Sequence, residues 1–150
     1  MKTTDLIKEM EEMKKRVEED ERADGTTLVD PYLFNLRDYK GNFYRASSMS
    51  GNSVFLKLHL EKGERENSII QGDYHEMLDS LREVVAEKDP WILLEFDGKY
   101  HMIEGIGGGT GEVDGKPHGS VFLKFNTKEG MTAEELATNI TRKMKKGEKK

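Results

Sequence analysis

Residues 53–60 read Ser-Val-Phe-Leu-Lys-Leu-His-Leu, and every second residue of this stretch is apolar. The apolar set comprises Val54, Leu56, Leu58 and Leu60. Because successive side chains of a strand point to opposite faces of a sheet, this alternation predicts a β-strand with one buried face. The other face would carry Phe55, Lys57 and His59.

The first five letters of this stretch, Ser-Val-Phe-Leu-Lys, recur at residues 120–124. Each copy follows a pattern typical of a β-hairpin, at residues 32–46 and at residues 91–103. The second hairpin signal contains Asp97-Gly98, a pair that favours two-residue type I′ turns because both positions need a positive φ.

Each copy also precedes a predicted helix with a capping box at its start. The first helix pairs Asp73 with Glu76, and the second pairs Thr132 with Glu135. The repeated string in the same order of elements predicts an internal duplication. We therefore expect an α+β fold with two tandem β-hairpin–strand–helix units, about six mainly antiparallel strands and a pseudo-two-fold axis.

A chain of 150 residues fits one domain with a substantial core. We expect a single domain over residues 1–150, divided as follows: an N-terminal amphipathic helix (1–24), a first unit (28–89), a second unit (90–146) and a disordered tail (147–150). The basic run over residues 142–150 is interpreted as a helix end whose cations complement the helix dipole.

Composition excludes several classes of protein. The chain has no cysteine, so disulfide frameworks, thiolate nucleophiles and thiolate metal sites are excluded. No apolar run is long enough to span a membrane, and the N-terminus lacks the apolar core of a signal peptide. We therefore expect a cytoplasmic protein. The net charge of −5 disfavours nucleic-acid binding without excluding a local basic patch.

The N-terminal helix carries one narrow apolar stripe, formed by Leu6, Met10, Met13 and Val17. Two interpretations are open. The stripe docks on the protein's own sheet, or it binds a partner protein or a second copy of the chain, a use for which adaptable methionine side chains are suited.

Glycine dominates residues Gly105 to Gly111. Within them, the candidate ligand loop is Gly107, Gly108, Gly109, Thr110 and Gly111. These five residues resemble part of the glycine loop of tubulin-type GTPases, which implies a nucleotide or phosphate ligand. No predicted helix follows to complete an anion site, and no Walker-type Lys-Ser/Thr pair is present. The alternative interpretation is a flexible connection between two strands.

The outward residues of the two repeated strings form a second candidate surface, comprising Phe55, Lys57, Phe122 and Lys124. Aromatic and basic side chains on one open sheet face are typical of sheets that stack the bases of single-stranded nucleic acid. The alternative is ordinary cross-strand packing of the two phenylalanines.

Four histidines are present, but none has a second histidine or a carboxylate at the close spacing of a metal motif. No Gly-x-Ser-x-Gly elbow marks a nucleophile. We therefore expect no metal, no cofactor and no catalysis. The favoured hypothesis is a non-catalytic module that binds a protein partner or itself, and the alternatives are a single-stranded nucleic-acid binder and a nucleotide-binding enzyme.

Overall fold

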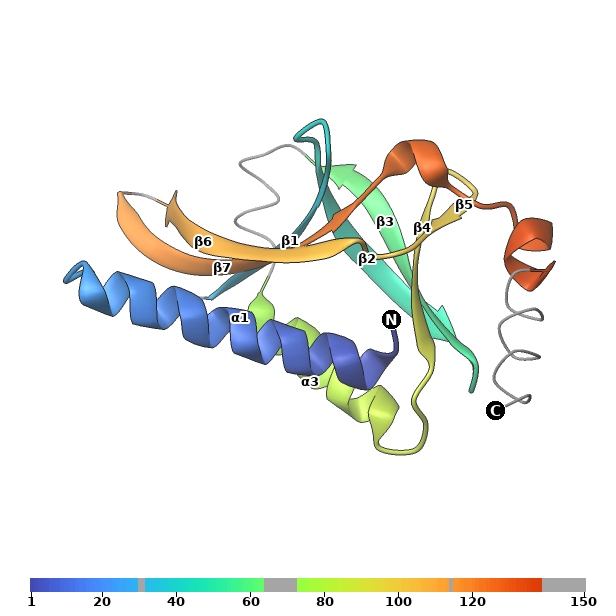
Figure 1. Cartoon of the computed structure of the whole chain (residues 1–150), viewed down its shortest axis with the longest axis horizontal. Coiled ribbons are helices and arrows are strands. Elements are labelled where there is room, and N and C mark those ends of the chain that lie inside the picture. The colour runs from blue at the N-terminus through green and yellow to red at the C-terminus, as the bar shows by residue number, and fades with distance from the viewer. Residues whose placement is uncertain (30–31, 64–72, 114, 139–150) are drawn as a thin grey trace.

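The computed structural model describes residues 1–29, 32–63, 73–113 and 115–138 (Figure 1). Its helical elements are α1 (Thr3–Ala23), α3 (Tyr74–Val85), the 3₁₀ turn η1 (Thr127–Glu129) and a helix over residues 133–138. Its strands are β1 (Leu33–Asp38), β2 (Phe43–Gly51), β3 (Phe55–Gly63), β4 (Trp91–Phe96), β5 (Lys99–His101), β6 (Gly105–Val113) and β7 (Lys116–Phe125). The predicted tail, residues 147–150, and the basic run, residues 142–150, lie outside the described residues.

The strands form one seven-stranded sheet in the order β5-β4-β3-β2-β1-β7-β6. Two neighbouring pairs, β3 with β4 and β1 with β7, are parallel, and the others are antiparallel. A parallel pair needs a long crossover, and α3 provides it between β3 and β4. The predicted α+β class is therefore confirmed.

The predicted six strands and internal duplication are wrong. The sheet has seven strands, and the second half of the chain lies on both sides of the first half. The strands β4 and β5 extend the sheet next to β3, whereas β6 and β7 extend it next to β1. The physical reason is that the repeated pentapeptide specifies alternation within a strand, and it does not specify which strands become neighbours.

Several local predictions are confirmed. Asp97 and Gly98 have φ values of 52° and 77°, as the predicted turn between β4 and β5 requires. The Asp73 carboxylate caps α3 and accepts hydrogen bonds from the backbone N–H groups of His75 (2.8 Å) and Glu76 (3.2 Å). Capping of this kind satisfies donors that the first helical turn leaves without partners.

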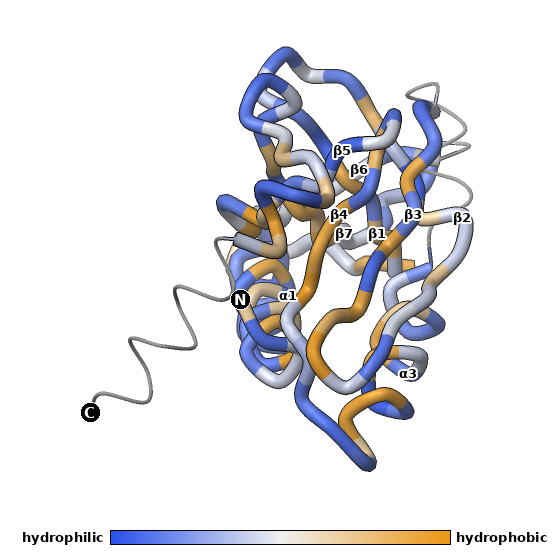
Figure 2. The backbone as a smooth tube through the Cα atoms, turned by 90° about the vertical axis from the view of Figure 1, so that its right-hand side faces the viewer, coloured by the Kyte–Doolittle hydropathy of each residue, from blue (hydrophilic) through white to orange (hydrophobic). Residues whose placement is uncertain are grey.

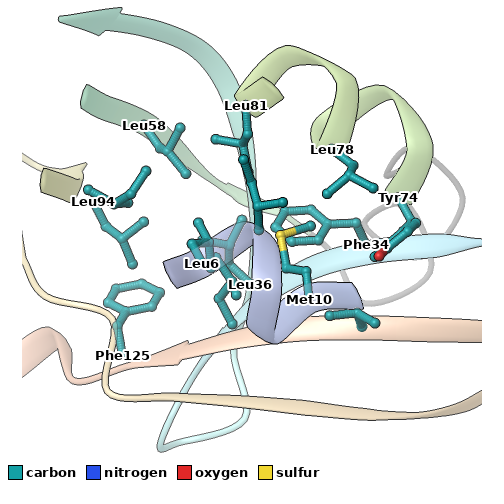
Figure 3. Close-up of a cluster of buried hydrophobic side chains, with 14 of the residues drawn as sticks. Leu6, Met10, Phe34, Leu36, Leu58, Tyr74, Leu78, Leu81, Leu94 and Phe125 are labelled. Atoms are coloured by element: carbon teal, nitrogen blue, oxygen red, sulfur yellow. The ribbon is translucent and has the colours of Figure 1, made fainter. Parts of the chain in front are cut away.

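The helices α1 and α3 cover one face of the sheet (Figure 1). Hydrophobic and hydrophilic stretches interleave along the chain (Figure 2), and the hydrophobic side chains of the helices and strands converge in one core. Figure 3 shows Leu6 and Met10 of α1 among side chains of the sheet and of α3. The alternation predicted for β3 is confirmed, because Leu56, Leu58 and Leu60 are buried in this core. No helix among the described residues has the length and apolar character that crossing a bilayer requires.

Candidate functional site

The glycine-rich stretch forms β6, an edge strand of the sheet. It pairs with β7 in an unbroken antiparallel register from Gly105, opposite Lys124, to Val113, opposite Lys116. In the described sheet no strand lies on its other side. The prediction of a flexible glycine loop is wrong, because these residues pair along their whole length.

Close packing explains two of the glycines of β6, Gly107 and Gly108. A Cβ atom on Gly108 would lie 2.6 Å from Val17 Cγ2 and 2.8 Å from Met13 Cγ, because α1 packs directly on this residue. On the opposite face, a Cβ atom on Gly107 would lie 2.4 Å from Phe122 Cε2. Glycine in a strand often marks such a close approach. Here the glycines allow α1 and Phe122 to contact the same short piece of backbone.

A groove of about 380 Å³ lies between α1 and the start of β6. Its lining residues are Met1, Glu9, Glu12, Met13, Arg16, Ile103, Glu104, Gly105 and Ile106. Four of these side chains, Met1, Met13, Ile103 and Ile106, are partly buried against the core, and we refer to the last three as the apolar floor of the groove. The lining carries three carboxylates and one guanidinium group, so its ionised side chains sum to −2 (1 − 3).

The opposite sheet edge differs from β6. The strand β5 has only three residues, Lys99–His101. Its outer side is covered, because Tyr100 and Met131 exchange two backbone hydrogen bonds of 2.8 Å. Proteins commonly protect sheet edges with very short strands and covering segments. Within the part of the chain that the structure describes, the β5 edge is therefore closed and the longer β6 edge has no neighbouring strand.

The predicted partner stripe on α1 faces the interior. Leu6 and Met10 are fully buried, Val17 is 6% exposed and Met13 is partly buried against the core. Of the two interpretations of the stripe, docking on the protein's own sheet is the one that fits these exposures. Of the four residues, Met13 alone keeps partial exposure, and it lines the groove beside β6.

The predicted aromatic and basic residues lie on the sheet face opposite α1 and α3, but the structure does not bring them together. Phe55 and Lys57 are on β3, whereas Phe122 and Lys124 are on β7, with β2 and β1 between them. Three strand spacings correspond to about 14 Å. The sheet therefore carries two separate groups of these residues.

Three aromatic rings on this face, those of Phe43, Tyr100 and Phe122, lie close to the protein's own cations. The Arg37 guanidinium lies 3.9 Å from the Phe122 ring centroid and 4.7 Å from that of Phe43. Lys57 Nζ lies 5.0 Å from the Tyr100 ring centroid. These are cation–π distances. The arrangement favours internal packing over an open platform for bases.

The same face holds a contact among Ser50, His59 and Glu95 that the sequence did not predict. Ser50 Oγ lies 2.6 Å from His59 Nε2, and His59 Nδ1 lies 2.8 Å from Glu95 Oε2. These side chains come from β2, β3 and β4. No sequence motif joins them, because their contact depends on the parallel pairing that sets His59 opposite Glu95.

Asp38 is a carboxyl group with a shifted pKa, and its contacts hold a turn of the sheet. Burial of Asp38 opposes its ionisation, but hydrogen bonds from Asn42, Tyr44 and the Lys40 backbone outweigh burial and hold the pKa of this carboxyl below its usual value. The same contact acts on its partner, since burial and then the bond to Asp38 raise the pKa of the Tyr44 hydroxyl. This cluster fixes the turn between β1 and β2.

Among the described residues, no group of three or more His, Asp or Glu side chains is placed to hold a metal ion. Comparison of the chain with protein-family models, curated proteins and solved structures gives no match. The function is therefore inferred from the geometry of the chain itself.

Proposed function

We propose that the protein is a binding module that captures an extended peptide segment of a partner protein as an additional strand on β6. The observation that carries this proposal is the open edge of β6, nine residues long and paired with β7 without a register shift. An open edge presents unpaired backbone N–H and C=O groups to any chain in an extended conformation.

The sequence of β6 lacks the usual protection against such pairing. Lysine, proline and β-bulges block edge strands in many proteins. Residues 105–113 contain no lysine and no proline, and Glu112 is their one charged residue. The glycines also leave the backbone accessible, because they present no side chains that would shield it.

The groove beside α1 supplies the chemistry for selecting the partner. Side chains of an added strand alternate between the two faces of the sheet. Every second side chain of the bound segment would therefore point toward α1, over the apolar floor of Met13, Ile103 and Ile106. Glu9 and Glu12 lie beside this floor and favour lysine or arginine at the flanks of the segment. The expected ligand is an extended peptide with alternating apolar residues and basic flanks.

A random peptide library displayed on phage tests the proposal with the full-length protein as bait. We expect the selected peptides to alternate apolar residues and to carry lysine or arginine at their flanks. Synthetic copies should bind the wild-type protein in solution by calorimetry. Failure to select any peptide, or selection of peptides without this pattern, would contradict the proposal.

A charge-reversed variant locates the site. Glu9→Lys combined with Glu12→Lys should weaken peptide binding by about two- to thirtyfold, since exposed ion pairs contribute roughly 0.2–1 kcal/mol each. The matched control combines Glu19→Lys with Glu83→Lys, exposed positions on α1 and α3 outside the groove, and changes the net charge equally. Equal weakening by both variants would indicate nonspecific attraction. Binding of single-stranded oligonucleotides in place of peptides would favour the opposite sheet face and reject the proposal.

A further inference from the structure

Ser50, His59 and Glu95 form a hydrogen-bonded relay on the sheet face opposite the helices. The ring of His59 joins the other two residues, with 2.6 Å from Nε2 to the Ser50 hydroxyl and 2.8 Å from Nδ1 to the Glu95 carboxylate. Both distances lie within the range of short, well-formed hydrogen bonds. The order of groups, hydroxyl then imidazole then carboxylate, is that of nucleophile, base and orienting acid in acyl-transfer catalysis.

The direction of the hydrogen bonds suits proton removal from Ser50. An ionised carboxylate only accepts hydrogen bonds, so the His59 Nδ1–H group donates to Glu95. In the neutral ring this leaves the Nε2 lone pair to accept the Ser50 hydroxyl proton. The carboxylate also stabilises the positive charge that the ring acquires when it takes this proton.

The backbone around Ser50 holds the hydroxyl group in place at an accessible position. Ser50 is exposed and lies one residue before the end of β2. The turn that follows is tight, because a Cβ atom on Gly51 would lie 2.3 Å from the Phe55 carbonyl oxygen. The Asn52 side chain accepts hydrogen bonds from the Val54 and Phe55 N–H groups (2.8 and 2.9 Å) and fixes this turn.

The other two members are accessible but restrained. The side chains of His59 and Glu95 are 31% and 28% exposed, so a small molecule can reach the ring while the strands limit its movement. Lys57 is the cross-strand partner of Ser50 and adds an ammonium group to the same face.

We propose that Ser50 is a nucleophile toward small activated carboxylic esters, with His59 as its general base and Glu95 as a positioning residue. Ser50 Oγ forms a bond to the acyl carbon as its proton passes to His59 Nε2. The bond to the leaving oxygen then breaks, and that oxygen takes the proton from His59. Water attacks the acyl-serine in the same manner, gives up a proton to His59, and releases the carboxylic acid and the restored Ser50 hydroxyl.

Hydrolysis of p-nitrophenyl acetate by the full-length protein tests this assignment. Ser50→Ala and His59→Gln should each lower kcat/KM by at least about 100-fold, the scale of general-base catalysis. The matched control is Ser48→Ala, a serine of the same strand that is the register partner of His59. Its activity should equal that of the wild type. A fluorophosphonate reagent should label Ser50, as peptide mass spectrometry would show.

Glu95 acts through His59, so its test compares the effects of substitution on kcat and on KM. Glu95→Gln should lower kcat and leave KM nearly unchanged, and Glu95→Asp should recover part of the loss. Circular dichroism melts identify any variant that fails to fold. In that case, labelling of the wild-type protein by the fluorophosphonate decides the test. Retention of activity in Ser50→Ala, or a label on another residue, would overturn the assignment. The groove variants at Glu9 and Glu12 should leave hydrolysis unchanged, which separates this activity from peptide binding.

Discussion

At Gly108 the space for one methyl group decides whether α1 can lie against β6. The absent Cβ would meet Val17 Cγ2 at 2.6 Å and Met13 Cγ at 2.8 Å. The neighbouring residue Gly109 has open space at the same point. Two adjacent glycines of one strand therefore differ in their tolerance of a side chain.

Gly108→Ala should lower the free energy of unfolding by about 1–3 kcal/mol, the usual cost of overpacking. Gly109→Ala should leave it unchanged or raise it by up to about 1 kcal/mol, because alanine reduces the entropy of the unfolded chain. Urea denaturation of both variants measures the difference. Equal stability of the two would contradict the close packing of α1 on β6.

The buried carboxylate of Asp38 accepts four hydrogen bonds. It accepts from the Lys40 and Asn42 backbone N–H groups, from Asn42 Nδ2 and from the Tyr44 hydroxyl, at 2.8–3.0 Å. Charged acceptors form the stronger class of hydrogen bond. The charge at Asp38 therefore stabilises the turn between β1 and β2.

Asp38→Asn should cost about 1–3 kcal/mol of stability at neutral pH, since it removes the charge and places an amide donor beside other donors. The folded pKa of Asp38 lies below its unfolded value, so its stabilisation is present above the unfolded pKa and is lost as pH falls through the folded one. The difference between wild type and variant should shrink below about pH 4. Asp79→Asn, at an exposed position on α3, serves as the control for a general charge effect. A pH-independent difference would reject the electrostatic explanation.

Among the elements, α3 links the two parallel strands β3 and β4, so its start is a sensitive point. Asp73→Ala removes the cap and should cost about 1 kcal/mol of stability, whereas Asp73→Asn should be nearly neutral because asparagine caps equally well. Thermal melts of both variants compare them directly. If the two variants lose the same stability, the Asp73 side chain does not act as the cap.

Elements with a strong local signal were predictable from sequence, and the glycine strand was not. The alternation over residues 53–60 predicts β3, and the Asp97-Gly98 pair predicts the turn that follows β4. The glycines of β6 suggested a loop because their local preferences oppose a strand. Packing by Val17 and Met13, residues about ninety positions earlier in the chain, overrides this preference.

For the molecule as a whole, the class of fold was predictable but the order of strands was not. A repeated pentapeptide suggested two similar units, while the second half of the chain divides between both edges of the sheet. The contact of Ser50, His59 and Glu95 depends on that order and on the β3–β4 register. The open edge of β6 depends on it as well, because an edge is defined only once every strand has its neighbours.

The two edges of the sheet differ in length, in composition and in what lies beside them. One edge is short and bridged by Met131, and the other is long, rich in glycine and next to the carboxylates of α1. The net charge of −5 adds a general attraction for basic partners. We infer that peptide binding occurs at the second edge.

Amide hydrogen exchange, measured by NMR with and without a selected peptide, tests strand addition at β6 most directly. An added strand hydrogen-bonds to alternate residues of the edge, so we expect slower exchange at every second amide between Gly105 and Glu112 and little change in β5. Unchanged exchange in β6, or protection confined to β3 and β7 on the face that carries Phe55 and Phe122, would contradict the proposed function.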